Sequence, residues 1–349
     1  MGITTTGWFA VRVFLTGGTG LVGRHVIAAL RTRGDSVRAL ARTEAAAADL
    51  SALGAEPLRG DLSDPARLDQ MTAGSDAVVH AAAVVLAGGR WAAWHAANVL
   101  GTERVARSSA RHGARLIHIS SVAVYGRQLA YDRDPVRLDE DFDLERAAVP
   151  RDHYARSKRD AEIAVWRVAR ETGLSAVALR PCVIYGEGDL HFSPRVARVL
   201  RRGLVPMIGD GANHLTVVYA GNVAAAVTAA LDNGGVSGPF NITNDGQITQ
   251  REFVERFAAG LGVRPRVLKI PHLLAWRVTW LLDATIGALL LSSGGPSLSS
   301  AVQFLAGENS YSSARAQQLL KWRPPVPAGD AVERTGATFR PAARSHSLP

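Results

Sequence analysis

Residues 15–26, LTGGTGLVGRHV, give the clearest indication of the fold class of this chain. They overlap a short apolar run, VRVFLTG (residues 11–17), which is typical of a buried strand. Residues 20–34, GLVGRHVIAALRTRG, then have the pattern of a helix that Gly34 ends. Gly17, Gly20 and Gly23 therefore stand where a strand turns into a helix. Glycines at such a turn let the backbone approach a pyrophosphate, and the helix N-terminus offers free N–H groups to the phosphates. The stretch predicts a dinucleotide-binding loop, and the alternative is a glycine-rich structural turn.

Strand and helix patterns alternate through the first 186 residues. Further strands are expected at 36–42, 76–83, 114–121 and 175–181, and helices at 64–74, 94–113 and 153–173. This alternation indicates right-handed βαβ units and a parallel sheet covered on both faces. We expect an α/β protein with a Rossmann-type, doubly wound parallel sheet and a smaller C-terminal substrate-binding domain. The expected divisions are an N-terminal extension (1–10), the dinucleotide-binding Rossmann domain (11–186), a mostly substrate-binding part that also returns to the Rossmann core (187–330), and a polar tail (331–349).

The composition narrows the class of protein. With 47% hydrophobic and 20% charged residues among 349, the chain is expected to be globular. Its net charge of +9 raises the possibility of nucleic acid or an anionic membrane as partner, but the arginines are scattered and form no binding tract. No nucleic-acid partner is therefore expected. The lone Cys182 excludes an internal disulfide, and the first ten residues do not resemble a signal peptide. We expect a cytoplasmic protein.

The end of the second expected strand distinguishes the two nicotinamide cofactors. An acidic residue there would bind the ribose 2′-hydroxyl, whereas an arginine would accommodate a 2′-phosphate. Ala41 takes the acidic position and Arg42 follows, with Arg38 nearby. The pattern favours NADP, and NAD is the alternative. Asp61, after the third strand, is placed to meet the adenine; its alternative role is a helix N-cap, which Ser63 or Asp64 suits better.

Tyr154 and Lys158 stand four residues apart in RDHYARSKRD, residues 151–160. On a helix they lie on one face, and the lysine charge favours the ionised tyrosine. The pair is a candidate proton donor and acceptor near neutral pH. The alternative is a solvated helix face.

Several motifs together resemble one family. The glycine loop, GDL (60–62), VVHAAA (78–83), NVLGTERV (98–105), ISSVAVYG (119–126), YARSK (154–158) and LRPCVIYG (179–186) follow the order and spacing of the extended short-chain dehydrogenase/reductases, often called NAD-dependent epimerase/dehydratases. The resemblance covers about residues 11–325. It implies a catalytic Ser121, Tyr154 and Lys158, with Asn98 matching a further motif asparagine. The cofactor-contacting positions that it implies are Gly17, Gly20, Leu21, Val22, Gly23, Arg42, Asp61, Leu62, Ala82, Tyr154, Lys158, Pro181 and Val183.

The resemblance implies hydride transfer coupled to proton transfer. Lys158 would bind the nicotinamide ribose and lower the pKa of Tyr154, while Ser121 would hold the substrate oxygen. Tyr154 would protonate an alkoxide in reduction and take the hydroxyl proton in oxidation. No metal is expected, because the spacing of the histidines is not that of metal ligands. They are interpreted as structural or substrate-lining: His80, His95, His118, His191 and His214.

The substrate class rests on one position in particular. Sugar-nucleotide enzymes of this family usually have an asparagine where this chain has Val183. The LRPxxxYG form, together with later segments, is similar to the 3β-hydroxysteroid dehydrogenase branch, which includes reductases of sterols and long-chain β-keto compounds. We expect an NAD(P)-dependent oxidoreductase acting on a hydrophobic sterol-like or β-keto acyl substrate. The alternatives are a nucleotide-sugar epimerase or dehydratase and a non-catalytic dinucleotide-sensing regulator; the regulator is disfavoured because both Tyr154 and Lys158 are present.

Two further expectations concern surfaces. Residues 271–291 are apolar nearly all round, apart from Arg277 and Asp283, and carry Trp276 and Trp280. We expect a helix that covers the substrate mouth or lies peripherally on a membrane, rather than a span, because charges deep in a bilayer are costly. The resemblance also implies a homodimer through the helices of Asn98 and Tyr154. Its apolar contacts are expected from three residues taken to point outward, Ala164, Val165 and Val168.

Overall fold

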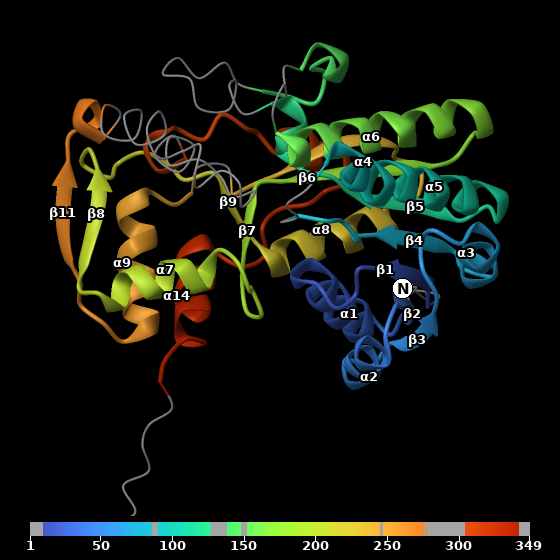
Figure 1. The fold of residues 1–349 in the computed structure, drawn as a ribbon, viewed down its shortest axis with the longest axis horizontal. Helices are drawn as coiled ribbons and strands as arrows, with labels where there is room; N and C mark the ends of the chain where they lie inside the picture. The colour runs from blue at the N-terminus through green and yellow to red at the C-terminus, as the bar shows by residue number, and fades with distance from the viewer. Residues whose placement is uncertain are drawn as a thin grey trace, which may run out of the picture.

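The structure is a computed structural model, and it describes residues 10–85, 90–126, 138–147, 152–244, 247–275, 277 and 304–341. A parallel sheet lies at its centre, with helices on both faces (Figure 1). Its seven strands have the order β10-β6-β5-β4-β1-β2-β3. Their bounds are β1 Arg12–Thr16, β2 Ser36–Ala41, β3 Glu56–Arg59, β4 Ala77–His80, β5 Arg115–Ile119, β6 Ala176–Pro181 and β10 Gly238–Ile242. The expected α/β, doubly wound parallel sheet is confirmed.

The strand side chains alternate between two cores. In β1, Val13 and Leu15 pack with α1 (Leu21–Arg33), α2 (Glu44–Ala52) and α8 (Ala220–Asp232). Phe14 points the other way and packs with α3 (Pro65–Thr72), α5 (Gly101–Arg111) and α6 (His153–Thr172). A strand buried on both faces needs an apolar residue at nearly every position, which explains the continuous apolar runs of the sequence.

The face of α6 that meets the sheet corrects one expectation. Val165 and Val168 are fully buried and pack in the core beneath α5 and α6, and Ala164 is also buried. They do not point outward, so they supply no apolar contact to a dimer. Helical periodicity identified the apolar stripe, and the sheet itself covers that stripe.

The C-terminal part has a core of its own. Two short parallel pairs, β7 (Val183–Tyr185) with β9 (Val217–Tyr219) and β8 (Leu204–Ile208) with β11 (Arg266–Ile270), lie beside α7 (Ser193–Arg201) and α9 (Gln250–Leu261). Tyr185, Phe253 and Phe257 are at its centre. The chain also returns to the central sheet here, because β10 pairs with β6 and α8 packs against α1.

The polar tail expected from residue 331 is wrong for its first part. Residues Ala328–Ala337 form helix α14, which packs against α9. Glycines permit the close approach: a Cβ at Gly260 would lie 2.0 Å from the carbonyl oxygen of Glu333, and one at Gly336 would lie 2.4 Å from that of Phe257. Sequence composition alone did not reveal this helix pair, because its glycines resemble those of a loop.

Two predicted segments lie largely or wholly outside the described residues. Of the apolar segment 271–291, the structure describes 271–275 and 277, so Trp276, Trp280 and Asp283 are not placed. Of the N-terminal extension 1–10, only residue 10 is described. Among the described residues, no helix combines the length and the apolarity needed to cross a membrane.

Candidate active site

The predicted cofactor residues gather at one edge of the sheet. Parallel strands bring their C-terminal ends together, and here the order reverses between β1 and β4, where a ligand crevice is expected. The residues that follow successive strands at this edge are Gly17 after β1, Arg42 after β2, Asp61 after β3, Ala82 after β4, Ser121 after β5 and Val183 after β6.

Two positions of the glycine loop are packed too tightly for any side chain. Gly17 has a φ of +77°, and a Cβ there would lie 2.6 Å from the backbone nitrogen of Ala82. A Cβ at Gly23 would lie 2.2 Å from the carbonyl oxygen of Gly17. Gly20 is the N-cap of α1 and has no side chain to cap it, so the N–H groups of Leu21 and Val22 stand at an open helix N-terminus. This cradle fits the pyrophosphate of a dinucleotide.

Of the two arginines near the end of β2, only one is available to a cofactor at this edge. Arg42 is exposed there. Arg38 instead donates to the carbonyl oxygen of Ala73 at 2.6 Å and to Ser75 Oγ at 2.9 Å. Asp61 accepts from the backbone N–H of Ser63, and hydrogen bonds from Ser63, followed by the nearby charge of Arg42, keep its pKa below the usual value. Asp64, not Asp61, caps α3 by accepting from Arg67 N.

Lys158 joins the helix of Tyr154 to the strand before Ser121. Its side chain is buried, and its Nζ donates to the carbonyl oxygen of Ile119 at 2.6 Å. Ile119 is the last residue of β5, two positions before Ser121. Burial lowers the pKa of the Lys158 ammonium to about 8, and the charge of Glu162 opposes this shift. The amine of Lys158 is therefore charged at neutral pH, but it loses its proton more easily than an ordinary lysine does.

Ser121 is held at the start of a short 3₁₀ turn, η2 (Val122–Tyr125), which contacts α6. Its Oγ accepts from the backbone N–H of Ala123 at 3.1 Å, and its side chain is nearly buried. Accepting this bond fixes the Oγ position while the hydroxyl proton can still be donated. Tyr154 is partly buried in the first turn of α6.

Asn98 lies in a π-helical turn, η1 (His95–Leu100), and uses its whole amide. Its Oδ1 accepts from Val84 N at 2.8 Å, and its Nδ2 donates to Val84 O at 3.0 Å and to Ser157 Oγ at 2.9 Å. Ser157 Oγ in turn donates to the carbonyl oxygen of Tyr154. With both donors and its oxygen engaged, Asn98 connects the loop after β4 to the first turn of α6.

Sequence reasoning missed a buried polar chain beneath this site. Thr102 Oγ1 donates to Asn98 O at 2.6 Å, so it accepts from His80 Nε2 at 2.9 Å, and His80 Nδ1 accepts from Thr16 Oγ1 at 2.6 Å. Burial lowers the pKa of His80 to about 3, which keeps the ring neutral. His118 stacks on it with ring centroids 5.5 Å apart. His80 thus serves the structure, one of the two roles expected for it.

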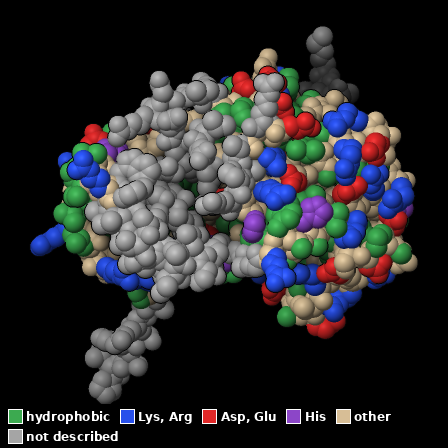
Figure 2. All heavy atoms as spheres, turned by 45° about the horizontal axis from the view of Figure 1, so that its top comes forward, with side chains coloured by type: hydrophobic (Ala, Val, Ile, Leu, Met, Phe, Trp, Pro, Cys, Tyr) green, Lys and Arg blue, Asp and Glu red, His purple; other side chains and the backbone are tan. Residues whose placement is uncertain are grey.

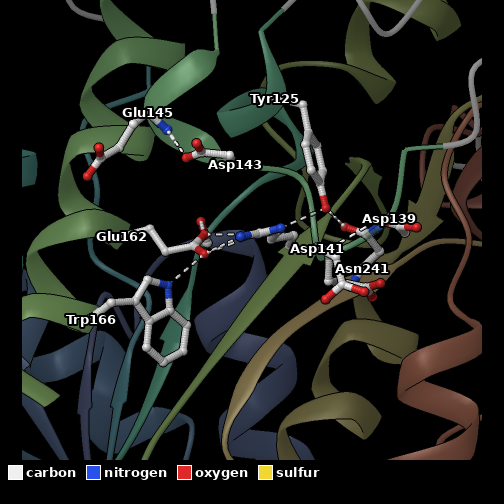
Figure 3. A network of polar contacts seen from close by, with 11 residues as sticks. Tyr125, Asp139, Asp141, Asp143, Glu145, Glu162, Trp166 and Asn241 are labelled. Atoms are coloured by element: carbon white, nitrogen blue, oxygen red, sulfur yellow. Dashed lines mark hydrogen bonds and ion pairs between the residues drawn. The ribbon is translucent and has the colours of Figure 1, made fainter. Parts of the chain in front are cut away.

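A second missed feature is the carboxylate of Glu162, one turn beyond Lys158 (Figure 3). It is fully buried and forms an ion pair of 2.6 Å with Arg180 of β6. It also accepts from Ser120 Oγ at 2.6 Å and from Trp166 Nε1 at 3.1 Å. Arg180 Nη1 then donates to the hydroxyl of Tyr125, which donates to Asn241 of β10. The four-residue spacing of Tyr154, Lys158 and Glu162 on one helix face was the signal that could have revealed it.

Known proteins resemble this chain along nearly its whole length. The NAD dependent epimerase/dehydratase family matches residues 13–243. A 4-hydroxy-2-methyl-3-oxo-4-farnesyl-3,4-dihydroquinoline-1-oxide ketoreductase of Stigmatella aurantiaca is 33% identical, covering 89% of this chain and 91% of its own. A 2-alkyl-3-oxoalkanoate reductase of Stenotrophomonas maltophilia is 31% identical, covering 94% and 99%. A sterol-4-alpha-carboxylate 3-dehydrogenase of Mus musculus is 26% identical, covering 95% and 91%.

The fold is also found among solved structures. UDP-glucose 4-epimerase of Thermus thermophilus, solved in complex with NAD, aligns with a TM-score of 0.66 at 22% identity and covers 95% of this chain and 100% of its own. At that identity the likeness concerns the fold alone. The relatives confirm the expected resemblance to extended short-chain dehydrogenase/reductases with 3β-hydroxysteroid dehydrogenase-like members. The chain belongs to the NAD dependent epimerase/dehydratase family.

Proposed function

We propose that this protein is an oxidoreductase that prefers NADP and interconverts a hydroxyl and a keto group on a hydrophobic substrate. The observation that supports it most is the buried Lys158, held against the end of β5 next to Ser121 and on the helix of Tyr154. Burying an ammonium is costly, and a catalytic use explains why a lysine is retained there.

In this function one chemical task would fall to each of Tyr154, Lys158 and Ser121. When bound, the nicotinamide supplies or accepts the hydride. Tyr154 would give its phenolic proton to the substrate oxygen in reduction and take the proton back in oxidation. The Lys158 charge would stabilise the phenolate that forms, and the hydroxyl of Ser121 would hold the substrate oxygen in place. Asn98 would act indirectly, by fixing the first turn of α6.

The preference for NADP is supported by Arg42. It is exposed at the end of β2, where the residue before it is an alanine instead of an acid. A guanidinium can pair with a 2′-phosphate in bidentate fashion, whereas Ala41 offers nothing to a 2′-hydroxyl. NAD remains the alternative cofactor.

The hydrophobic substrate is supported by Val183 and by the relatives. Val183 lies in β7 and packs at the edge of the C-terminal core, so an apolar side chain stands where sugar-nucleotide enzymes usually have an asparagine. Two relatives are named for a farnesyl-bearing ketone and for 2-alkyl-3-oxoalkanoates. The second candidate is a nucleotide-sugar epimerase, favoured by the fold of the Thermus structure. A non-catalytic regulator is disfavoured by the intact Tyr154 and Lys158.

A substrate panel tests the proposal. Nicotinamide absorbance is followed with 2-alkyl-3-oxoacyl compounds, steroid ketones and UDP- or dTDP-sugars, and sugar epimerisation is assayed separately because it regenerates its cofactor. We expect turnover with a hydrophobic ketone and none with the sugars. Epimerisation of a sugar nucleotide without any response to the hydrophobic ketones would overturn the substrate class.

Replacement of the proposed acid tests the chemistry independently of the substrate class. Tyr154→Phe should nearly abolish turnover, because it removes the proton donor and retains the ring. Cofactor affinity, measured by fluorescence titration of the same variant, should stay close to that of the wild type. Turnover within about threefold of the wild type would exclude Tyr154 as the acid.

A further inference from the structure

A basic and apolar surface lies on the C-terminal part, far from the glycine loop. It is formed by the end of α7, the β8–β11 pair and the residues after β11, and we call it the β11 surface. Its defining residues are Arg202, Leu204, Arg266, Leu268 and Leu273. Figure 2 shows hydrophobic and basic side chains next to each other at the left edge of the molecule, the side on which β11 lies in Figure 1.

The strand register explains why leucines are exposed here. β8 and β11 form a separate two-stranded parallel sheet, in which Leu204 pairs with Arg266 and Pro206 pairs with Leu268. Paired residues of a sheet point to the same face. On this face Leu204 is 52% exposed and Leu268 is 50% exposed, and beyond β11 Leu273 is 57% exposed. Large aliphatic side chains gathered on one exposed face indicate an interaction surface.

The charge of the same segments has a single sign. Residues 193–208 contain four arginines, and residues 264–277 contain three arginines and one lysine. Neither segment contains an aspartate or a glutamate. In the rest of the chain acidic residues are interspersed among the basic ones, as in the Glu103–Arg107 and Glu103–Arg167 ion pairs of α5 and α6. The β11 surface therefore attracts an anionic partner.

The chemistry of the surface distinguishes three kinds of partner. A second copy of the chain docked face to face would bring two basic surfaces together, which electrostatic repulsion disfavours. Single-stranded nucleic acid is bound through aromatic stacking platforms, whereas this surface offers leucines. An anionic bilayer uses both features, because aliphatic side chains enter the interface while arginine and lysine meet the headgroups. We propose that the β11 surface docks the protein onto an anionic lipid bilayer.

The proposal goes beyond the proposed function and stands independently of it. It rests on described residues of α7, β8 and β11 and on Leu273, which lies in the described start of the apolar segment 271–291, and on none of residues 278–291. Docking would bring the C-terminal part close to the bilayer, into which hydrophobic ketones of the proposed class partition.

Vesicle flotation with the full chain tests the docking. Vesicles of phosphatidylcholine alone are compared with vesicles that also contain phosphatidylglycerol. We expect binding to the anionic vesicles and little to the neutral ones. The binding should be largely lost at about 1 M NaCl, where the Debye length is about 3 Å.

Matched variants assign the binding to this surface. Arg202→Gln with Arg266→Gln should weaken vesicle binding at least about tenfold, because each basic residue near an anionic surface contributes appreciably. Arg31→Gln with Arg67→Gln removes the same charge from exposed positions on α1 and α3 and should leave binding nearly unchanged. Leu268→Ser should weaken binding, and Leu319→Ser, at a leucine that is 43% exposed on α13 (Ala314–Leu319), should not.

Three results would overturn the proposal. The first is equal binding to neutral and anionic vesicles. The second is an equal loss in both arginine pairs, which would mean that only the net charge matters. The third is RNA binding that depends on Arg202 and Arg266 when vesicle binding does not, which would assign the surface to nucleic acid. Circular dichroism of each variant checks that its fold is intact.

Discussion

Lys158 holds a positive charge where water does not reach. Its pKa in the folded protein is about 8, against about 10.4 in an unfolded chain. As the pH rises through 8, the folded state loses this proton before the unfolded state does. Between about pH 8 and 10 the unfolded state therefore binds more protons, and the contribution of Lys158 to the free energy of unfolding rises with pH. At pH 7 the buried charge of Lys158 therefore lowers the free energy of unfolding of the protein.

Lys158→Met should therefore be inactive and yet more stable than the wild type at pH 7. The gain should be on the order of 3 kcal/mol, reduced by the lost hydrogen bond to Ile119, and it should shrink toward pH 10 because the wild type no longer buries a charge there. Urea unfolding of both proteins at the two pH values measures it. A stability difference that does not change with pH would contradict the assignment of this pKa to Lys158.

Arg42 and Arg38 form a natural pair for testing the cofactor choice. Arg42→Ala should weaken NADPH binding much more than NADH binding, because only NADPH has the 2′-phosphate. Arg38→Ala is the control, since Arg38 contacts Ala73 and Ser75 and should affect both cofactors alike. Fluorescence titration of both cofactors gives the two ratios. Equal losses in Arg42→Ala would show that Arg42 is an ordinary surface residue.

At the scale of elements, helix α6 presents Tyr154, Lys158 and Glu162 along one face, and the third of these joins α6 to β6. Both side chains of the Glu162–Arg180 pair are almost completely buried, at 0% and 2% exposure. A buried ion pair gains little over an apolar pair, but breaking it leaves an uncompensated charge. Glu162 also reaches Ser120, so it holds the residue next to Ser121.

A double-mutant cycle measures this coupling. Arg180→Met should destabilise the protein by about 3–5 kcal/mol, because Glu162 then remains buried without its cation. Adding Glu162→Gln should recover part of this loss, since the amide is neutral. Urea unfolding of the two single variants and the double variant gives the interaction energy. Losses that simply add would mean that the two side chains are not coupled in solution.

At the scale of the whole molecule, the outer surface of α5 and α6 determines what a dimer could be. Glu103 pairs with Arg107 and Arg167, and Arg107 also pairs with Glu171. The residues expected to give an apolar centre, Val165 among them, are buried under the helix instead. An interface here would consist mainly of charged side chains.

The homodimer through the helices of Asn98 (η1 and α5) and Tyr154 (α6) stays a prediction, and the charged surface adds an expected dependence on salt. We expect a dimer at micromolar protein concentration that dissociates as salt rises toward about 1 M, because exposed ion pairs are screened. Light scattering across a salt series measures the mass. A monomer at low salt, or a dimer indifferent to salt, would contradict the expected interface.

The parallel sheet, the glycine loop and the placement of Tyr154 and Lys158 on one helix face were predictable from the sequence, whereas Ser121 came from the family resemblance. These depend on local features: the period of apolar residues, glycines at a strand–helix turn, and a four-residue spacing on one helix. Because parallel strands share an edge at their C-terminal ends, motifs that follow successive strands were bound to meet.

Which polar groups pair at a distance could be learned from the three-dimensional packing alone. Asn98 meets Ser157 across 59 residues, and Tyr125 meets Asn241 across 116. Burial obliges each of these polar groups to form a hydrogen bond. The sequence shows that the groups are polar, but it does not show which partner each of them meets. No local pattern specifies packing, and three further features depend on it. Helix α14 packs closely on α9, Arg38 bonds away from the cofactor edge, and Val165 points into the core.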